Sequence, residues 1–308
     1  MFEFKEGENF NHPSTICQTY GAPICGIYAS LRQAGIYRIF RGLKFEPDAE
    51  IGQKVPFCKG LESSKPVVVF LNGTMQTTFN WRPHAHVFKD SFRVILYDAR
   101  AQGQSELGKT KLSLDLHLKD LSELLHHLKI KKAHLLGLSH GAYVALAFAS
   151  RLPDFVDRLI LCSISAEKSA QTKIIVKSWL GILKSEGLDA LAWTVLPMVF
   201  GEDFLKANKR ILYKMVEAIV VRNNKKALIA QLKAMNHYTP IDRPAKKINC
   251  PALVISGSQD QLVNPKEARQ LADLCGGCHK EIPDIGHSIP AETPELFNKI
   301  VLKFLLQP

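Results

Sequence analysis

The sequence has 308 residues, of which 46% are hydrophobic and 22% are charged, and its net charge is +11. This composition is typical of a globular chain with one large core, and it excludes disordered and fibrous classes. No apolar run approaches the roughly 20 residues of a membrane span, and the first residues lack the charged and apolar regions of a signal peptide. We therefore expect a cytoplasmic protein without a membrane span.

The positive charge is concentrated between residues 164 and 250, which hold 15 Lys and Arg against 7 Asp and Glu. Such a segment can attract an anionic partner, for example a coenzyme A thioester, an acidic acyl carrier protein, nucleic acid or a membrane surface. Solvated faces of amphipathic helices explain the same excess equally well. Among partners we expect a small-molecule substrate, with an anionic carrier if the basic segment has a role, and no nucleic acid.

The seven cysteines are an odd number scattered along the chain, which is typical of free thiols in a reducing compartment. Cys275, Cys278 and His279 match the pattern for covalent haem attachment, and the first four residues of that run match a redox CxxC motif. The run lies between a predicted helix and a predicted strand, so a Gly-rich helix stop is the favoured interpretation. No cofactor is expected. No metal is expected either, because the paired histidines lack a third ligand at metal-binding spacing.

From about residue 65 onward, short β-branched runs alternate with longer helical patterns, which predicts an α/β fold with a mostly parallel central sheet flanked by helices. The predicted strands are residues 66–71, 92–97, 133–138, 159–162, 252–256 and a segment at 282. The predicted helices of the core are residues 114–128, 142–151, 265–274 and 294–306. Candidate antiparallel edge strands lie near residues 36–40 and 51–57, and residues 1–34 form an N-terminal extension of unknown role.

The segment between the fourth and fifth predicted strands has a different pattern. It is poor in strand signals and rich in helical runs, at residues 174–183, 188–200, 204–221 and 226–235. We therefore predict an inserted helical cap at residues 164–250, on a core formed by residues 1–163 and 251–308.

The candidate nucleophile is Ser139, in the run Gly137-Leu-Ser-His-Gly141 between a predicted strand and a predicted helix. The flanking glycines permit the tight turn that projects a hydroxyl outward, and the small residues Gly141 and Ala142 let the helix approach the strand closely. A serine that merely caps the helix is the alternative. The surrounding pattern favours the nucleophile.

A serine nucleophile requires a base, and the base requires an orienting carboxylate. Asp260 follows the fifth predicted strand, and His287 follows it in turn, which gives the chain order Ser, Asp, His. Singly, Asp260 is explained as a turn residue and His287 as a helix-capping residue, but their order with Ser139 favours a catalytic triad. Backbone N–H groups of His140 and Thr74 are the predicted oxyanion donors, with Met75 as the alternative to Thr74.

Over about residues 60–308 the chain resembles the α/β-hydrolase superfamily. Asn72-Gly73 occupies the place of that superfamily's usual His-Gly, and residues 98–105 resemble its Asp-x-Arg-Gly-x-Gly-x-Ser turn, with Ala101 replacing the first glycine. The chain is similar to capped enzymes such as 3-oxoadipate enol-lactonase, through Asn72, and pimeloyl-carrier methyl esterase, through the basic cap. The resemblance implies an α/β-hydrolase fold, and we expect Asn72, Gly73, Met75 and Trp81 to bind substrate. Haloalkane dehalogenases use an Asp nucleophile, so Ser139 argues against them.

These observations predict a serine hydrolase that cleaves a carboxylic ester, lactone or thioester through an acyl-enzyme. An acyltransferase or a C–C hydrolase would use the same site. A ligand receptor that makes no use of the triad is the alternative from a different class.

Overall fold

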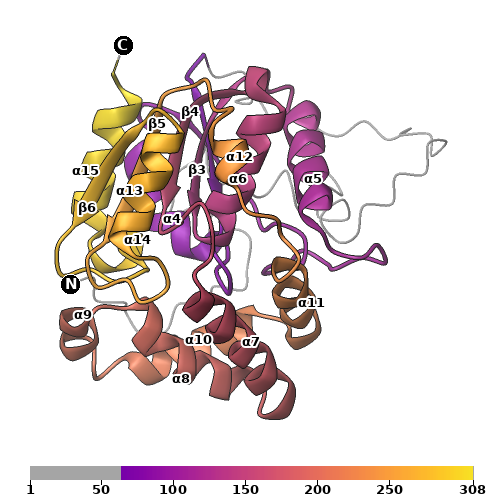
Figure 1. The fold of residues 1–308 in the computed structure, drawn as a ribbon, viewed down its shortest axis with the longest axis vertical. Coiled ribbons are helices and arrows are strands. Elements are labelled where there is room, and N and C mark those ends of the chain that lie inside the picture. The colour runs from indigo at the N-terminus through magenta and orange to yellow at the C-terminus, as the bar shows by residue number, and fades with distance from the viewer. Residues whose placement is uncertain (1–63, 308) are drawn as a thin grey trace, which may run out of the picture.

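The computed structural model describes residues 64–307, so the candidate edge strands and the extension at residues 1–34 lie outside the described residues (Figure 1). Within this range the sheet has the order β2-β1-β3-β4-β5-β6, and every neighbouring pair is parallel. The strands are β1 (Val67–Leu71), β2 (Arg93–Leu96), β3 (Ala133–Leu138), β4 (Val156–Cys162), β5 (Ala252–Gly257) and β6 (Cys278–Ile282). The predicted α/β fold with a mostly parallel sheet is confirmed.

The strands are apolar because helices cover both faces of the sheet. Every residue of β3 and of β5 is buried, as expected for central strands between two helical layers. Successive residues of β1 point to opposite faces: Val69 joins the core cluster formed with α5, α6 and α13, whereas Phe70 joins the one formed with α4 and α15. The helices named here are α4 (Thr78–Phe88), α5 (Leu114–His127), α6 (His140–Arg151), α13 (Pro265–Leu274) and α15 (Pro294–Leu305).

Helix α4 was not among the predicted elements. It begins at a capping box in which the Thr77 hydroxyl accepts from the backbone and the Asn80 side chain accepts from the N–H of Thr77. Pro83 lies inside the helix, and proline normally argues against a helical interior. The helix packs on the sheet through Trp81, Ala85 and Phe88, all of them buried.

The segment at residues 164–250, which we call the cap segment, contains only helices between β4 and β5. They are α7 (Ala170–Ser185), α8 (Leu188–Val199), α9 (Glu202–Ala207), α10 (Leu212–Arg222), α11 (Lys225–Met235) and α12 (Asp242–Ala245). Figure 1 shows α7 to α11 gathered beyond one end of the sheet, while α12 packs against α6 and α13.

One predicted helix of the cap segment is two helices in the structure. The run at residues 204–221 is interrupted after α9, where Asn208 is the C-cap residue and its side-chain amide donates to the carbonyl of Phe204 (2.9 Å). Asparagine is favoured at helix ends because its side chain competes for backbone hydrogen bonds. The continuous helical period did not reveal this break.

The remaining short elements are η1 (Pro153–Phe155), which leads into β4, and α14 (Ile289–Glu292), which follows His287. Across residues 64–307, no helix combines the length and the apolar character that a membrane crossing requires.

Candidate active site

Ser139 lies in a strained turn between β3 and α6. Its backbone has φ 53° and ψ −114°, a conformation that residues with a side chain rarely adopt. The N–H of Ser139 donates to the carbonyl of Cys162 (2.8 Å), which ties the turn to β4. A Cβ on Gly141 would overlap the carbonyl of Leu71, and one on Gly137 would overlap the backbone of α6. Both glycines are therefore required by the close approach of α6 to the sheet.

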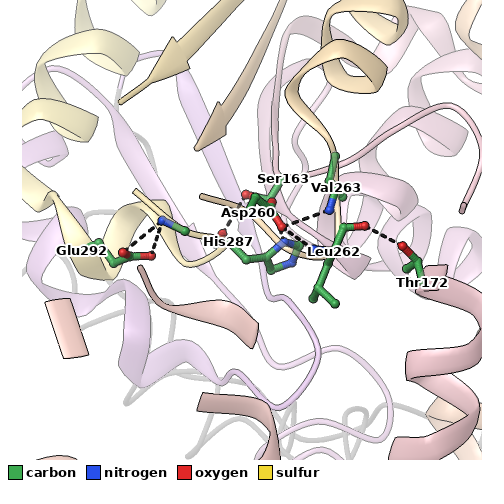
Figure 2. Close-up of polar contacts among 8 residues, drawn as sticks. Ser163, Thr172, Asp260, Leu262, Val263, His287 and Glu292 are labelled. Atoms are coloured by element: carbon green, nitrogen blue, oxygen red, sulfur yellow. Dashed lines mark hydrogen bonds and ion pairs between the residues drawn. The ribbon is translucent and has the colours of Figure 1, made fainter. Parts of the chain in front are cut away.

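His287 and Asp260 form a buried pair. His287 Nδ1 lies 2.8 Å from Asp260 Oδ2, and neither side chain is more than 7% exposed. The other carboxylate oxygen, Oδ1, accepts the backbone N–H groups of Leu262 (2.8 Å) and Val263 (3.0 Å) (Figure 2). With Asp260 ionised, Nδ1 carries the proton and donates to the carboxylate, which leaves His287 Nε2 free to accept another. Ser139 and His287 line the same cavity.

The loop that carries His287 is held on two sides, as Figure 2 shows. Ser163 Oγ donates to the carbonyl of His287 (2.7 Å), which fixes the loop to the end of β4. Glu292 accepts the N–H of Gly286 (3.1 Å) and also the N–H of Gly201 in the cap segment (2.8 Å). Burial raises the pKa of Glu292, while these N–H bonds favour its ionised form. One carboxylate thus joins the histidine loop to the cap segment.

The two predicted oxyanion donors, in Thr74 and His140, belong to residues that line the same cavity as Ser139. His140 is the first residue of α6, so its N–H has no acceptor within the helix. Thr74 and Met75 follow β1 and line the cavity with His140. Met75 has φ 64°, and its carbonyl accepts the Asn223 amide of the cap segment (3.0 Å). The N–H of Gly73 is already bonded to the Gln76 side chain, which leaves the next amide, that of Thr74, as the candidate donor.

Two of the residues expected to contact substrate, Asn72 and Trp81, are not among those that line the cavity. Asn72 is 3% exposed, and its amide donates to the Tyr97 carbonyl and to Asp98 Oδ1, both at 3.2 Å. It therefore shapes the loop after β1. Trp81 is 1% exposed, and the centre of its ring lies 5.1 Å from the centre of the Phe70 ring. It lies on the face of α4 turned toward the sheet, whereas Gly73 and Met75 do line the cavity.

The turn at residues 98–105 supports the same loop. Asp98 accepts the N–H of Thr78 (2.7 Å) as well as the Asn72 amide, and burial raises the pKa of its carboxyl. Ala101, which replaces the superfamily's first glycine, has φ 68° and therefore takes the left-handed conformation that glycine would adopt at less cost. Ala101 therefore differs from the motif in residue type, while the backbone keeps the conformation of the turn.

The imidazole of His140 is structural. Its Nε2 lies 3.3 Å from Tyr238 Oη, and its Nδ1 lies 3.3 Å from Gln231 Nε2. Because the Gln231 amide donates, Nδ1 accepts and Nε2–H points to the tyrosine. Burial lowers the pKa of His140 well below its ordinary value, and burial lowers that of the adjacent His117 to about 4. The ring is neutral and ties the turn at Ser139 to the cap segment.

The cavity above Ser139 has a volume of about 340 Å³. Much of its wall comes from apolar side chains of the cap segment, which the sequence did not distinguish from ordinary packing residues. They include Val176, Trp179, Val195, Phe200, Ile219 and Met235. Polar residues missed by the sequence analysis also line it, among them Tyr143, Ser163, Lys168 and Tyr238. No linear motif marks these residues, because they come together only through packing of the cap segment.

The model of the family described as "Serine aminopeptidase, S33" matches residues 62–294. The chain belongs to this family of α/β-hydrolases. It is 28% identical over 253 residues to a putative carbamate hydrolase RutD from Caulobacter sp., covering 80% of this chain and 92% of that one. It is 22% identical over 240 residues to 3-oxoadipate enol-lactonase 2 from Acinetobacter baylyi, covering 78% and 88%.

The fold is similar to solved structures as well. The crystal structure of the enol-lactonase from Burkholderia xenovorans superposes with a TM-score of 0.74 at 29% sequence identity, covering 80% of this chain and 93% of that one. The predicted resemblance to the α/β-hydrolase superfamily, and to enol-lactonases within it, is therefore confirmed, and the chain is a member of a family of hydrolases.

Proposed function

We propose that this hydrolase cleaves a carboxylic ester, lactone or thioester, with Ser139 as the nucleophile, His287 as the base and Asp260 as the orienting acid. One observation carries the proposal. A serine held at φ 53° between a strand and a helix shares a cavity with a histidine whose Nδ1 is bonded to a buried carboxylate at 2.8 Å. A triad is recognised by this geometry and by the roles of its members.

The reaction follows from these positions. Ser139 Oγ attacks the carbonyl carbon while His287 Nε2 takes the hydroxyl proton, and the amides of Thr74 and His140 stabilise the oxyanion. Collapse of the tetrahedral intermediate breaks the bond to the leaving group, which receives the proton from Nε2. Water, deprotonated by the same nitrogen, then attacks the acyl-enzyme. Collapse of this second intermediate releases the acid, and Ser139 Oγ takes back its proton from Nε2. Asp260 stabilises the imidazolium that forms in each step.

The cavity favours a small substrate with an apolar portion. A volume of about 340 Å³ lies within the range of small-molecule sites, and aliphatic and aromatic side chains of the cap segment form much of its wall. The relatives named carbamate hydrolase and enol-lactonase support attack at an acyl carbonyl carbon. Within this proposal the partner is a small acyl ester, lactone or thioester, free or on an anionic carrier such as coenzyme A or acyl carrier protein, in the cytoplasm.

The test is one matched panel of acyl chains, presented as neutral esters and as coenzyme A thioesters, with wild type, Ser139→Ala and the exposed control Asp189→Asn. We expect activity in the wild type and the control and its loss in Ser139→Ala. Hydroxylamine and alcohols added as competing acceptors separate a hydrolase from an acyltransferase through the products. Equal turnover by Ser139→Ala would overturn the proposal, and tight binding without turnover would support a receptor.

A further inference from the structure

Lys168 places a cation in the wall of the cavity. It lies between β4 and α7, and its ammonium donates to the backbone carbonyl of Met235 (2.6 Å) and stands 5.9 Å from the centre of the Tyr238 ring. No ion pair found among residues 64–307 includes Lys168. An ammonium group has three N–H donors, and the one carbonyl uses a single donor.

The carboxylate next to Lys168 in the chain is engaged elsewhere. Glu167 pairs with Lys173 (3.1 Å), and both of these side chains are more than half exposed. Burial, together with the positive charge of Lys173, lowers the pKa of Lys168 to about 8. Lys168 is therefore mostly protonated at pH 7. A partly buried charge normally has a counter-ion, and within the described residues Lys168 has none.

Two sets of contacts link the ammonium of Lys168 to the candidate oxyanion loop and to the residue after Ser139. Met235 accepts from Lys168 through its carbonyl, and its sulfur lies 3.5 Å from Thr74 Oγ1, in the candidate oxyanion loop. The ring of Tyr238 lies near the ammonium, while its hydroxyl lies 3.3 Å from His140, which directly follows Ser139. The charge of Lys168 also contributes to the lowered pKa of His140.

We propose that Lys168 forms an anion subsite that selects substrates whose acyl portion carries a carboxylate a few bonds from the scissile carbonyl. The substrate class is then the half-esters, or corresponding thioesters and lactones, of short dicarboxylic acids. This inference rests on the proposed serine hydrolase function. Lys173 and Glu167 also line the cavity but pair with each other, so Lys168 is the cavity lysine left without a carboxylate partner among the described residues. It matches one substrate carboxylate, and the apolar wall of the cap segment accommodates the methylene chain between the two carbonyl groups.

The experiment compares monomethyl glutarate with methyl pentanoate, in which a methyl group replaces the carboxylate at the end of the same acyl chain. The ratio of kcat/KM for the charged ester to that for the neutral ester is measured for wild type, Lys168→Met, Lys168→Arg and the control Lys173→Met. We expect the wild type to favour the charged ester and Lys168→Met to reduce the ratio roughly 10- to 100-fold, the range for a hydrogen bond to a charged group. Lys168→Arg should restore most of the ratio, and Lys173→Met should change it little.

The pH dependence gives an independent readout that a structural role of Lys168 would not produce. The ratio should be nearly constant between about pH 6 and 7, where the substrate carboxyl stays ionised. It should fall as the pH rises through about 8, because Lys168 then loses its proton. Lys168→Arg should keep the ratio at pH 9. Among the described residues, the charged or titratable groups next to Lys168 include Lys173, Tyr238 and His140, together with its chain neighbour Glu167. Burial raises the pKa of Tyr238 and lowers that of His140, so neither ring changes charge in this interval.

Failure of this inference is distinguishable from failure of the proposed function. If Ser139→Ala is inactive while the wild type shows no preference for the charged ester, or Lys168→Met keeps the preference, the subsite is wrong and the hydrolase stands. If neither ester is turned over, isothermal titration calorimetry measures the binding of glutarate and of pentanoate and so tests the subsite without turnover. Glutarate must then bind the wild type at least tenfold more tightly than Lys168→Met, and equal binding or no binding overturns the subsite.

Discussion

The cavity has two walls of different character. The sheet side contains Ser139, Thr74 and His287, which follow the ends of strands of the sheet. Here the backbone of α6 lies so close to the end of β1 that Gly141 has no room for a Cβ. The cap side is built from side chains on the helices of the cap segment, whose outer surfaces expose large apolar groups such as Tyr213 (65%) and Val221 (80%). We therefore expect the proposed chemistry to depend on a rigid part of the molecule, and substrate selection to depend on a part that tolerates substitution.

The largest loss of stability should come from a substitution that forces α6 away from the end of β1. Gly141→Ala forces a methyl group into the carbonyl of Leu71, and we expect a loss of about 4 kcal/mol or more in the free energy of unfolding. The matched control is Gly181→Ala in α7, where nothing lies within 4 Å of the added methyl. That change should stabilise the protein by about 0.5–1 kcal/mol, because alanine favours helix. Urea unfolding measures both, and equal effects would contradict the contrast between the two walls.

Asp260→Asn should separate catalysis from stability on the sheet side, because the substitution keeps the size and shape of the side chain. The amide can still accept the backbone N–H groups of Leu262 and Val263, but it no longer stabilises a positively charged His287. We expect kcat to fall roughly 10³- to 10⁴-fold with an almost unchanged melting temperature. Steady-state kinetics and thermal unfolding check this, with the exposed Asp189→Asn as control. Near wild-type kcat would show that Asp260 is only a turn residue.

Glu292 connects the histidine loop to the cap segment, so its removal should lower both the stability of the protein and its kcat. Glu292→Ala leaves the N–H groups of Gly201 and Gly286 without their acceptor, and each unpaired group costs about 1–3 kcal/mol where it is buried. We expect lower stability and a kcat reduced about tenfold, with partial recovery in Glu292→Gln, which retains an accepting oxygen. Glu295→Ala, at the start of α15, is the control. A stability loss with unchanged kcat would exclude a role for Glu292 in positioning His287.

The smallest effect belongs to the contact between the cap segment and α4. The Arg222 guanidinium lies 3.5 Å from the centre of the Phe79 ring, and at a half-exposed site such a pair contributes about 0.5–1 kcal/mol. Phe79→Leu should therefore lower the free energy of unfolding by no more than that and change KM by less than about threefold. Urea unfolding and kinetics, with Val221→Ala as control, check this. A large fall in kcat would show that the cap wall is less tolerant than its packing indicates.

The sequence indicated how Ser139, Asp260 and His287 are placed because local rules govern these positions. Strand ends, the glycines around Ser139 and the order of Asp260 and His287 are short-range patterns, and in a parallel sheet these strand ends meet at one edge. The structure brings Ser139 and His287 into one cavity and His287 onto Asp260, as the motifs predicted. Their catalytic roles remain predictions until the variants are measured.

The cap side could not be predicted because it depends on contacts distant in sequence. Lys168 meets the carbonyl of Met235, 67 residues away, and no motif relates the two. Trp81 shows the same limit on the sheet side, because its closeness in sequence to Gly73 did not reveal which face of α4 it occupies. Helix α4 itself was missed because Pro83 and several polar residues obscure its apolar face.

The most direct test of the central claim is covalent labelling with a fluorophosphonate, followed by digestion and mass spectrometry of the labelled peptide. The reagent captures a serine only when a base activates its hydroxyl. We predict a single adduct on Ser139 in the wild type, much slower labelling in His287→Ala and none in Ser139→Ala. An adduct on another residue, or an active enzyme whose Ser139 stays unlabelled, would contradict the assignment of Ser139 as the nucleophile.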